Sequence, residues 1–270
     1  MASNGPTLLK LPAEIRTTIF DYALHCNTEK TAFRNHNVSG GVVLDEKYSA
    51  STRLALLLTS RQCYSDASLT AIKSTPFVVS NLFSQVQDHL AALHPKQQSA
   101  LRHLAFVADA RHFRRFADWK THAFGLTNLD LDTLTVVLHQ STPWHYLFDF
   151  TSDIVQLLRN LCNVKRLVFV RNGARVKGSF RTWFNRLVGL MMKVDHQERY
   201  CREEARPESV WWDWRFDELG QRIVLDARPS KEWVGEEAYL ESMLPFVEAW
   251  RESIENEEYN PDPRSRTMYY

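Results

Sequence analysis

Hydrophobic residues near the start of the chain recur at helical spacing. Ile15, Ile19, Tyr22 and Ala23 lie three and four positions apart, which is the pattern of one face of an amphipathic helix. Pro12 precedes them and suits the first turn of a helix, because its missing N–H would lack a partner there anyway. The pattern therefore predicts a helix that begins near Pro12.

A second pattern covers residues 53–73 and also predicts a helix, with small residues along one side that allow a close helix crossing. Ser74-Thr75-Pro76 ends this helix, and a short β-prone run, Phe77-Val78-Val79, follows. Residues 25–53 separate the two helices. They contain a Val42-Val43-Leu44 run that predicts a strand or a hairpin.

Three apolar runs of strand length then recur at intervals near 30 residues. Their cores align as Leu104-Ala-Phe-Val, Leu134-Thr-Val-Val and Leu167-Val-Phe-Val, and a helix is predicted before the third, at 152–161. Helices and strands at such intervals are typical of a leucine-rich-repeat-like stack, in which each unit buries its apolar face on its neighbours. They also fit an ordinary α/β domain whose helices cross over a parallel sheet.

The rest of the chain predicts further helices and strands. Helices are expected over 81–93, 179–196 and 239–255, and a pair of strands over 211–216 and 221–226, joined by a turn near Gly220. The last residues, 259–270, are rich in Pro and Arg and predict a flexible tail.

Basic and aromatic side chains follow each of the three aligned runs. The candidates for binding a target are Arg111, Arg114, Arg115 and Trp119 after the first run, Trp144 and His145 after the second, and Arg171, Arg175 and Lys177 after the third. Parallel strands end at one edge of their sheet, so these loops are expected on the same edge. Such an edge could bind a peptide, a phosphate or single-stranded nucleic acid by charge and stacking, or it could be a solvated loop edge.

Charge is distributed unevenly, although the net charge of the 270 residues is only +1. Residues 154–194 contain nine basic and no acidic residues, whereas residues 195–270 contain 19 acidic and 10 basic residues. Pairing between these two regions within the molecule is the first interpretation. The alternative is a basic surface for an acidic partner or nucleic acid.

Motifs of enzymes and metal sites are missing from the sequence. The four cysteines are far apart, no His-Glu-x-x-His or Cys/His cluster occurs, and there is no P-loop, nucleophile elbow or Gly-x-Gly-x-x-Gly. We therefore expect no catalytic residue, no metal and no cofactor, and we expect that the protein is not an enzyme. Because no secretory signal and no membrane-length apolar run is visible, a cytoplasmic or nuclear chain with reduced thiols is expected.

The two helical patterns together carry a resemblance. Leu11-Pro12 followed by Glu14-Ile15-Arg16, then Leu57-Leu58-Thr59-Ser60-Arg61-Gln62, then Pro76-Phe77-Val78-Val79, resembles the F-box-like proteins abundant in filamentous fungi. The resemblance covers about 50 residues. It departs from the ordinary F-box pattern at the inserted segment 25–53, because an F-box joins its helices by short turns.

The resemblance implies a substrate-recognition subunit of an SCF-type ubiquitin ligase, whose head docks on the ligase adaptor and whose C-terminal region selects an unknown protein target. The implied adaptor-binding residues are Leu11, Pro12, Ile15, Ile19, Leu57, Leu58, Arg61 and Tyr64. The expected fold is mixed α/β (α+β), with an F-box-like helical head at 1–80, a leucine-rich-repeat-like region at 81–258 and a tail at 259–270. The alternatives are a non-catalytic fungal scaffold or regulatory protein that does not bind the adaptor, and a basic-surface binder of nucleic acid or a phospho-ligand.

Overall fold

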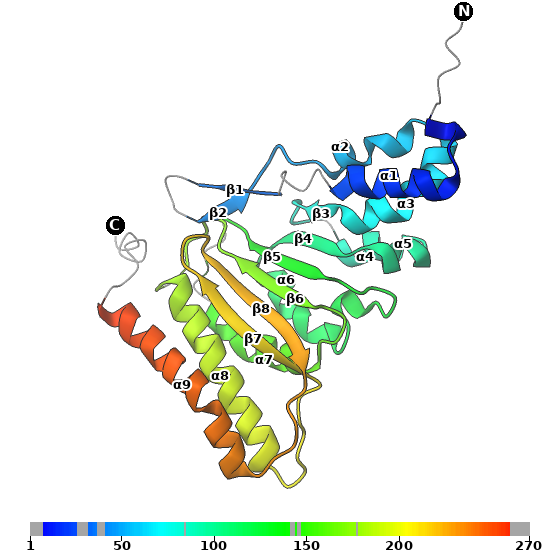
Figure 1. Cartoon of the computed structure of the whole chain (residues 1–270). Coiled ribbons are helices and arrows are strands. Elements are labelled where there is room, and N and C mark those ends of the chain that lie inside the picture. Colours follow the sequence, from blue (N-terminus) through cyan, green and yellow to red (C-terminus); the bar gives the residue numbers. More distant parts are fainter. Residues whose placement is uncertain are drawn as a thin grey trace, which may run out of the picture.

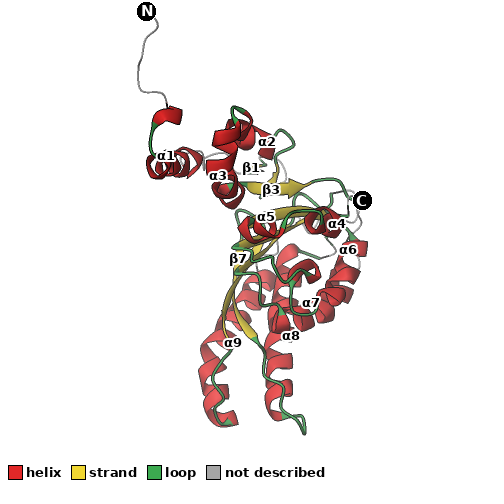
Figure 2. Ribbon diagram, turned by 90° about the vertical axis from the view of Figure 1, so that its right-hand side faces the viewer, coloured by secondary structure: helices red, strands yellow, loops and turns green. Residues whose placement is uncertain are grey.

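A computed structural model describes residues 8–25, 32–36, 41–83, 85–140, 144, 147–176 and 178–259 of the chain. The described residues form a mixed α/β fold built around a six-stranded sheet (Figure 1). Most helices lie on one face of this sheet, and a group of N-terminal helices lies beyond its first edge strand (Figure 2). None of the described helices is both long enough and apolar enough to cross a membrane.

The sheet has four parallel strands and an antiparallel pair. Its strands are β3 (Pro76–Val79), β4 (His103–Ala108), β5 (Thr133–Leu138), β6 (Arg166–Val170), β7 (Val210–Asp217) and β8 (Arg222–Pro229). They lie in the order β3-β4-β5-β6-β8-β7. The first four are parallel, whereas β8 is antiparallel to both β6 and β7. The predicted strand pair near Gly220 is therefore confirmed.

The alignment of the three apolar runs is confirmed by the register of the sheet. Leu104 pairs with Leu134, and Leu134 pairs with Leu167, in neighbouring parallel strands. Alternate residues of each strand face opposite sides of the sheet, so these three leucines share one face. That face is covered by helices, and the interpretation of the strands as leucine-rich-like repeats stays a prediction.

The helices behind the sheet supply most of the core. They are α4 (Val86–Ala91), α5 (Pro95–Ala100), α6 (Ala110–Arg115), α7 (Thr151–Asn160), α8 (Phe180–Tyr200) and α9 (Glu236–Tyr259). The prediction of one helix over 81–93 is wrong in its first turn. The Asn81 side chain accepts a hydrogen bond from the Phe83 backbone N–H at 2.9 Å, which favours a turn there instead of a helix start.

The helical head packs α1 (Ala13–His25) against α3 (Arg61–Ser74). Phe20 and Leu24 of α1 share a buried cluster with Cys63, Ala67 and Ala71 of α3, whose small side chains allow the close crossing. A short 3-10 turn, η1 (Leu8–Lys10), precedes α1.

The single helix predicted over 53–73 is instead divided into α2 (Ala50–Leu54), the 3-10 turn η3 (Ala55–Leu58) and α3. The break falls at Thr59 and Ser60. The Ser60 hydroxyl accepts a hydrogen bond from the Cys63 backbone N–H at 3.0 Å and caps α3. A serine cap of this kind satisfies a free N–H and favours a new helix start over a continuous helix.

The described part of segment 25–53 forms a hairpin of β1 (Phe33–Asn35) and β2 (Val42–Leu44), as the Val-Val-Leu run predicted. Phe33 and Val42 pack against Val168, Val170 and Val224 of the sheet. These three valines alternate with core residues of β6 and β8, so the hairpin lies on the face opposite the helices. The insertion therefore connects the head to the sheet. The predicted tail lies outside the described residues, except Tyr259, which ends α9.

Candidate functional site

The helical head exposes apolar side chains on α1. Its inner face carries Arg16, Phe20 and Leu24, which are buried. Ile15 and Ile19 lie on another face, and 50% and 39% of their surfaces are exposed. Apolar side chains that a helix does not bury in its own domain mark a candidate contact surface for another protein.

Most other residues implied as adaptor-binding are also accessible. Leu58 on η3 has 87% of its surface exposed, Pro12, Arg61 and Tyr64 are exposed, and Leu11 is half-buried. Leu57 differs, because it is buried in the head core with Phe20. The structure therefore assigns Leu57 to the packing of the head and not to its surface.

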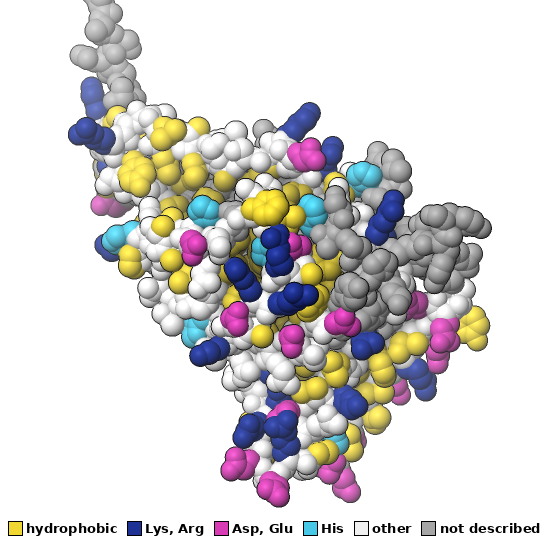
Figure 3. All heavy atoms as spheres, turned by 180° about the vertical axis from the view of Figure 1, so that it is seen from behind, with side chains coloured by type: hydrophobic (Ala, Val, Ile, Leu, Met, Phe, Trp, Pro, Cys, Tyr) yellow, Lys and Arg dark blue, Asp and Glu magenta, His cyan; other side chains and the backbone are white. Residues whose placement is uncertain are grey.

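A second candidate site lies where β4 ends, at the edge predicted from the basic and aromatic loops. A cleft of about 370 Å³ opens there. It is lined by Gln85, Val86, Gln87, Phe106, His112, Arg115, Phe116, Asp118, Trp119, Phe124 and Gly125. A smaller hollow of about 120 Å³ adjoins it, lined by Leu82, Phe83, Gln85, Arg111, His112 and Arg115. In Figure 3, basic side chains gather near the middle of the face, beside hydrophobic ones.

Asp109 organises the polar side of this cleft. It follows β4 directly and caps α6, accepting hydrogen bonds from the backbone N–H groups of Arg111 and His112. Its carboxylate also pairs with the Arg111 guanidinium at 2.7 Å and with the His112 Nδ1 at 2.8 Å. Burial alone would raise the pKa of Asp109, but the hydrogen bonds from Arg111 and His112 outweigh burial and lower it to about 2.

The predicted target-binding tryptophans are both buried. Trp119, in the 3-10 turn η4 (Phe116–Trp119), forms part of the cleft wall. Trp144 has only 1% of its surface exposed, and its indole N–H donates to the His139 carbonyl at 3.0 Å. Its ring packs 5.1 Å from that of Phe113. A large aromatic side chain gains more by entering the core than by standing in a loop, so Trp144 is not part of the edge surface.

The arginines predicted at this edge have different surroundings. Arg111 and Arg115 line the hollows, and Arg114 is exposed but lines neither. Arg171 donates to the Ala174 carbonyl at 3.0 Å, which braces its own turn, and Arg175 is exposed. His145 and Lys177 lie outside the described residues.

Several cations of the basic region 154–194 pair with acidic side chains of the same molecule. Arg159 pairs with Asp195 at 3.2 Å, Arg166 with Asp226 at 2.5 Å, Arg181 with Glu218 at 3.4 Å and Lys165 with Asp132 at 2.7 Å. Three of these four carboxylates come from residues after 194. Pairing between the two regions is therefore confirmed for Arg159, Arg166 and Arg181, whereas Lys165 pairs with a residue that precedes both regions. These ion pairs reduce the charge available to nucleic acid.

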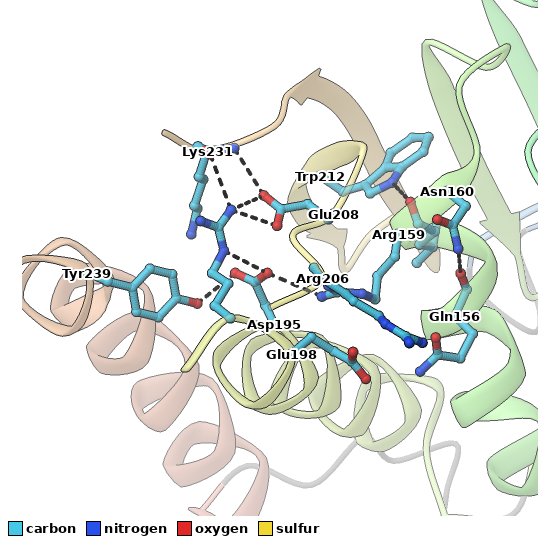
Figure 4. Close-up of polar contacts among 12 residues, drawn as sticks. Gln156, Arg159, Asn160, Asp195, Glu198, Arg206, Glu208, Trp212, Lys231 and Tyr239 are labelled. Atoms are coloured by element: carbon cyan, nitrogen blue, oxygen red, sulfur yellow. Dashed lines mark hydrogen bonds and ion pairs between the residues drawn. The ribbon is translucent and has the colours of Figure 1, made fainter. Parts of the chain in front are cut away.

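A buried ionic cluster, which no pattern in the sequence predicts, joins α8 to the segments around β7 and β8 (Figure 4). The Arg199 guanidinium donates to both oxygens of Glu208, at 2.6 and 2.7 Å, and to Asp195 at 3.1 Å. The Tyr239 hydroxyl donates to the other Asp195 oxygen at 2.7 Å. Burial raises the pKa of Glu208, and the nearby Asp195 carboxylate raises it further. Burial alone would raise the pKa of Asp195. Its side-chain hydrogen bonds, one of them from Tyr239, and the charge of Arg199 outweigh burial and lower this pKa.

This cluster stabilises the arrangement of three elements. Arg199 has no exposed side-chain surface, and both carboxylates are almost as deeply buried. Its partners lie on α8, on the segment leading into β7 and, through Tyr239, on α9. We therefore assign the cluster a structural role in holding the hairpin and α9 against α8.

Two cysteines lie near histidines on the surface. Cys162 Sγ is 3.7 Å from His122 Nε2, and Cys201 Sγ is 3.9 Å from His196 Nδ1. Neither cysteine lines the cleft at β4. Within the described residues, no group of three or more His, Cys, Asp or Glu side chains is arranged to hold a metal ion.

Comparison with known proteins finds no match to this chain among family profiles, curated proteins or solved structures.

Proposed function

We propose that this chain is a protein-interaction module that acts as a substrate-recognition subunit of an SCF-type ubiquitin ligase. In this proposal, an F-box-like head docks on the ligase adaptor, and a leucine-rich-repeat-like region presents a target-binding edge. The supporting observation is the set of exposed apolar side chains on the head, including Ile15, Ile19 and Leu58.

The arrangement of α1 supports docking through this surface. Its inner face contacts α3 through the Arg16–Asp66 ion pair at 2.7 Å and through the buried cluster that contains Phe20 and Leu24. Ile15 and Ile19 lie outside this cluster and are exposed. Burying such side chains in an interface would gain about 25 cal/mol per Å² of apolar surface removed from water.

The insertion 25–53 bears on the main alternative, a scaffold that does not bind the adaptor. Its described strands pack on the sheet valines, and Ile15 and Ile19 of α1 are exposed. The described part of the insertion therefore leaves these two side chains accessible. The nucleic-acid alternative has weaker support, because at least four of the nine cations of region 154–194 form ion pairs within the molecule.

The proposal is tested by measuring binding of the purified full chain to the ligase adaptor by isothermal titration calorimetry. We expect Ile15→Asp and Ile19→Asp each to weaken binding at least about tenfold, as buried interface anchors do, without loss of thermal stability. Leu244→Asp is the matched control, because Leu244 is an apolar residue of α9 with 55% of its surface exposed. No binding by the wild-type chain, or equal losses from all three variants, would refute adaptor docking through the head.

A further inference from the structure

The two hollows beside the end of β4 form one groove. Gln85, His112 and Arg115 line both hollows and form the boundary between them. Together they extend from the segment before α4 to the turn after η4. A groove with two adjoining compartments suits a ligand with two consecutive side chains better than a single compact molecule.

The floor of the larger compartment is apolar and aromatic. Phe106, Phe116, Trp119 and Phe124 line it, although each is buried. The ring centroid of Trp119 lies 4.7 Å from that of Phe116 and 4.5 Å from that of Phe124. Aromatic rings at such separations favour a further ring placed edge-to-face or offset against them. This compartment therefore suits an aromatic side chain.

The rim between the compartments is cationic. Arg115 donates to the Gln85 side-chain oxygen at 3.2 Å across the groove, and it forms no ion pair with any carboxylate in the described residues. Arg111, by contrast, is already paired with Asp109 and lies over the exposed Phe83 ring at 5.3 Å. Arg115 is thus the cation best placed to bind an incoming carboxylate. The Asp118 carboxylate on the same lining can accept a backbone N–H of the ligand.

The lip of the larger compartment is held in an unusual backbone conformation. Lys120 and Phe124 adopt positive φ angles of 54° and 58° although neither is glycine. The buried Asn163 side chain braces this lip, accepting from the Ala123 backbone N–H at 2.7 Å and donating to the Leu129 carbonyl at 2.9 Å. Such strained residues persist where the surrounding structure holds them, and they concentrate at ligand-binding segments. The groove is therefore pre-formed.

From these observations we propose that the groove binds a peptide segment in which an aromatic side chain enters the larger compartment and a neighbouring carboxylate pairs with Arg115. The source of the peptide, a protein target recruited for ubiquitination, rests on the proposed function. The preference for an aromatic side chain beside a carboxylate rests on the groove alone. A peptide is favoured over RNA because the cations here are few and two carboxylates, Asp109 and Asp118, lie beside them. Repeated phosphates would need a longer continuous basic surface.

The test uses the full chain and isothermal titration calorimetry with a synthetic peptide, acetyl-Gly-Asp-Phe-Asp-Gly-amide. We expect binding of this peptide, and at least tenfold weaker binding when its Phe is replaced by Ala or both of its Asp by Asn. Arg115→Gln is expected to weaken binding about ten- to a hundredfold, the range for losing a hydrogen-bonded charge. Gln87→Trp is expected to abolish binding by filling the larger compartment.

Arg114→Gln provides the contrast, because it removes the same charge from the same helix at a position that lines neither compartment. We expect it to weaken binding less than about threefold, through the long-range field alone. Equal losses in Arg114→Gln and Arg115→Gln, or no binding to the wild-type chain, would overturn the inference. Binding of 3-phenylpropionate as tight as that of the peptide would also overturn it in favour of a small acid.

These outcomes can be separated from those for the head. The peptide titration needs no adaptor, and Ile15→Asp lies outside the groove, so it should retain full peptide binding. Loss of adaptor binding with intact peptide binding would count against the ligase role only.

Discussion

Replacing Arg199 by Met should destabilise the protein far more than replacing any exposed arginine. Methionine keeps much of the side-chain volume but removes the only cation that contacts both Glu208 and Asp195 through side-chain hydrogen bonds in the described cluster. Both carboxylates then remain buried, with 2% of their side-chain surfaces exposed. They lose an attractive partner and repel each other.

The expected loss follows from this arrangement. Breaking a buried ion pair by removing one partner costs roughly 3–5 kcal/mol, because it leaves an uncompensated charge. Arg159 and Tyr239 still contact Asp195, so Glu208 suffers most of the loss. We therefore expect a decrease of about 3–5 kcal/mol in the free energy of unfolding. This is a large part of the total for a domain with a stability of about 5–15 kcal/mol.

Urea unfolding followed by far-ultraviolet circular dichroism would measure this loss. Arg251→Met is the matched control, because Arg251 is exposed and its ion pair with Glu255 is long, at 3.6 Å. This variant should lose less than about 0.5 kcal/mol of unfolding free energy. Adding Glu208→Gln to Arg199→Met should restore at least about 1 kcal/mol, since it removes the unpaired charge.

The pH dependence gives a second check on the same reasoning. In the Arg199→Met variant, folded Glu208 should have a pKa above its unfolded value, so the folded state binds more protons than the unfolded state. Stability of the variant should then fall as pH rises, and its deficit should be smaller near about pH 5 than near about pH 8. A loss below about 1 kcal/mol, or a deficit that does not change with pH, would refute the assigned role of the cluster.

Two further predictions concern the helix packing and the cleft. Gly189→Ala should lower the free energy of unfolding by about 1–3 kcal/mol, although Ala has the better helix propensity, because its Cβ would lie 2.6 Å from the Trp250 ring. In a Trp250→Leu background the same change should cause no loss. A double-mutant cycle in urea measures both values. The pKa of Asp109 is lowered to about 2 in the folded state. The ionised carboxylate should therefore contribute about 2 kcal/mol to the free energy of unfolding above about pH 4, and this contribution should be lost as pH falls through about 2. Asp109→Asn should therefore destabilise the chain by about 2 kcal/mol at neutral pH and by less than about 0.5 kcal/mol near pH 2, where the folded carboxylate is about half protonated. A difference of about 2 kcal/mol that persists at pH 2 would contradict the ionic origin.

The proposed binding groove and the ionic cluster lie in different parts of the molecule. The groove lies where β4 ends, and the cluster lies between α8, α9 and the β7–β8 hairpin. A variant such as Arg199→Met should therefore alter stability without directly changing the groove. Binding variants at Arg115 should alter affinity without a comparable change in stability.

The sequence determined most strands and the long helices, although not the break at Ser60, and the likeness of three apolar runs determined the register of the parallel strands. Leu104, Leu134 and Leu167 were aligned from the sequence and lie side by side in the sheet. Elements of this kind are predictable because spacing along one segment decides which face becomes apolar. The Val42-Val43-Leu44 run predicted a strand or a hairpin from its β-prone composition, and it forms β2 of a hairpin.

Only the tertiary structure decided which side chains meet. Arg115 was a candidate from its loop, but Gln85 lies 30 positions earlier and no local pattern connects the two. Arg199, Glu208 and Tyr239 likewise come from separate segments, and charged residues spaced in this way usually predict solvated surface. Trp144 and Leu57 were expected at binding surfaces but are buried in cores. The free energy gained by removing a large apolar side chain from water favours burial even when the residue lies in a loop or turn. Spacing along the chain thus set the helices and strands, whereas contacts between distant segments set the groove.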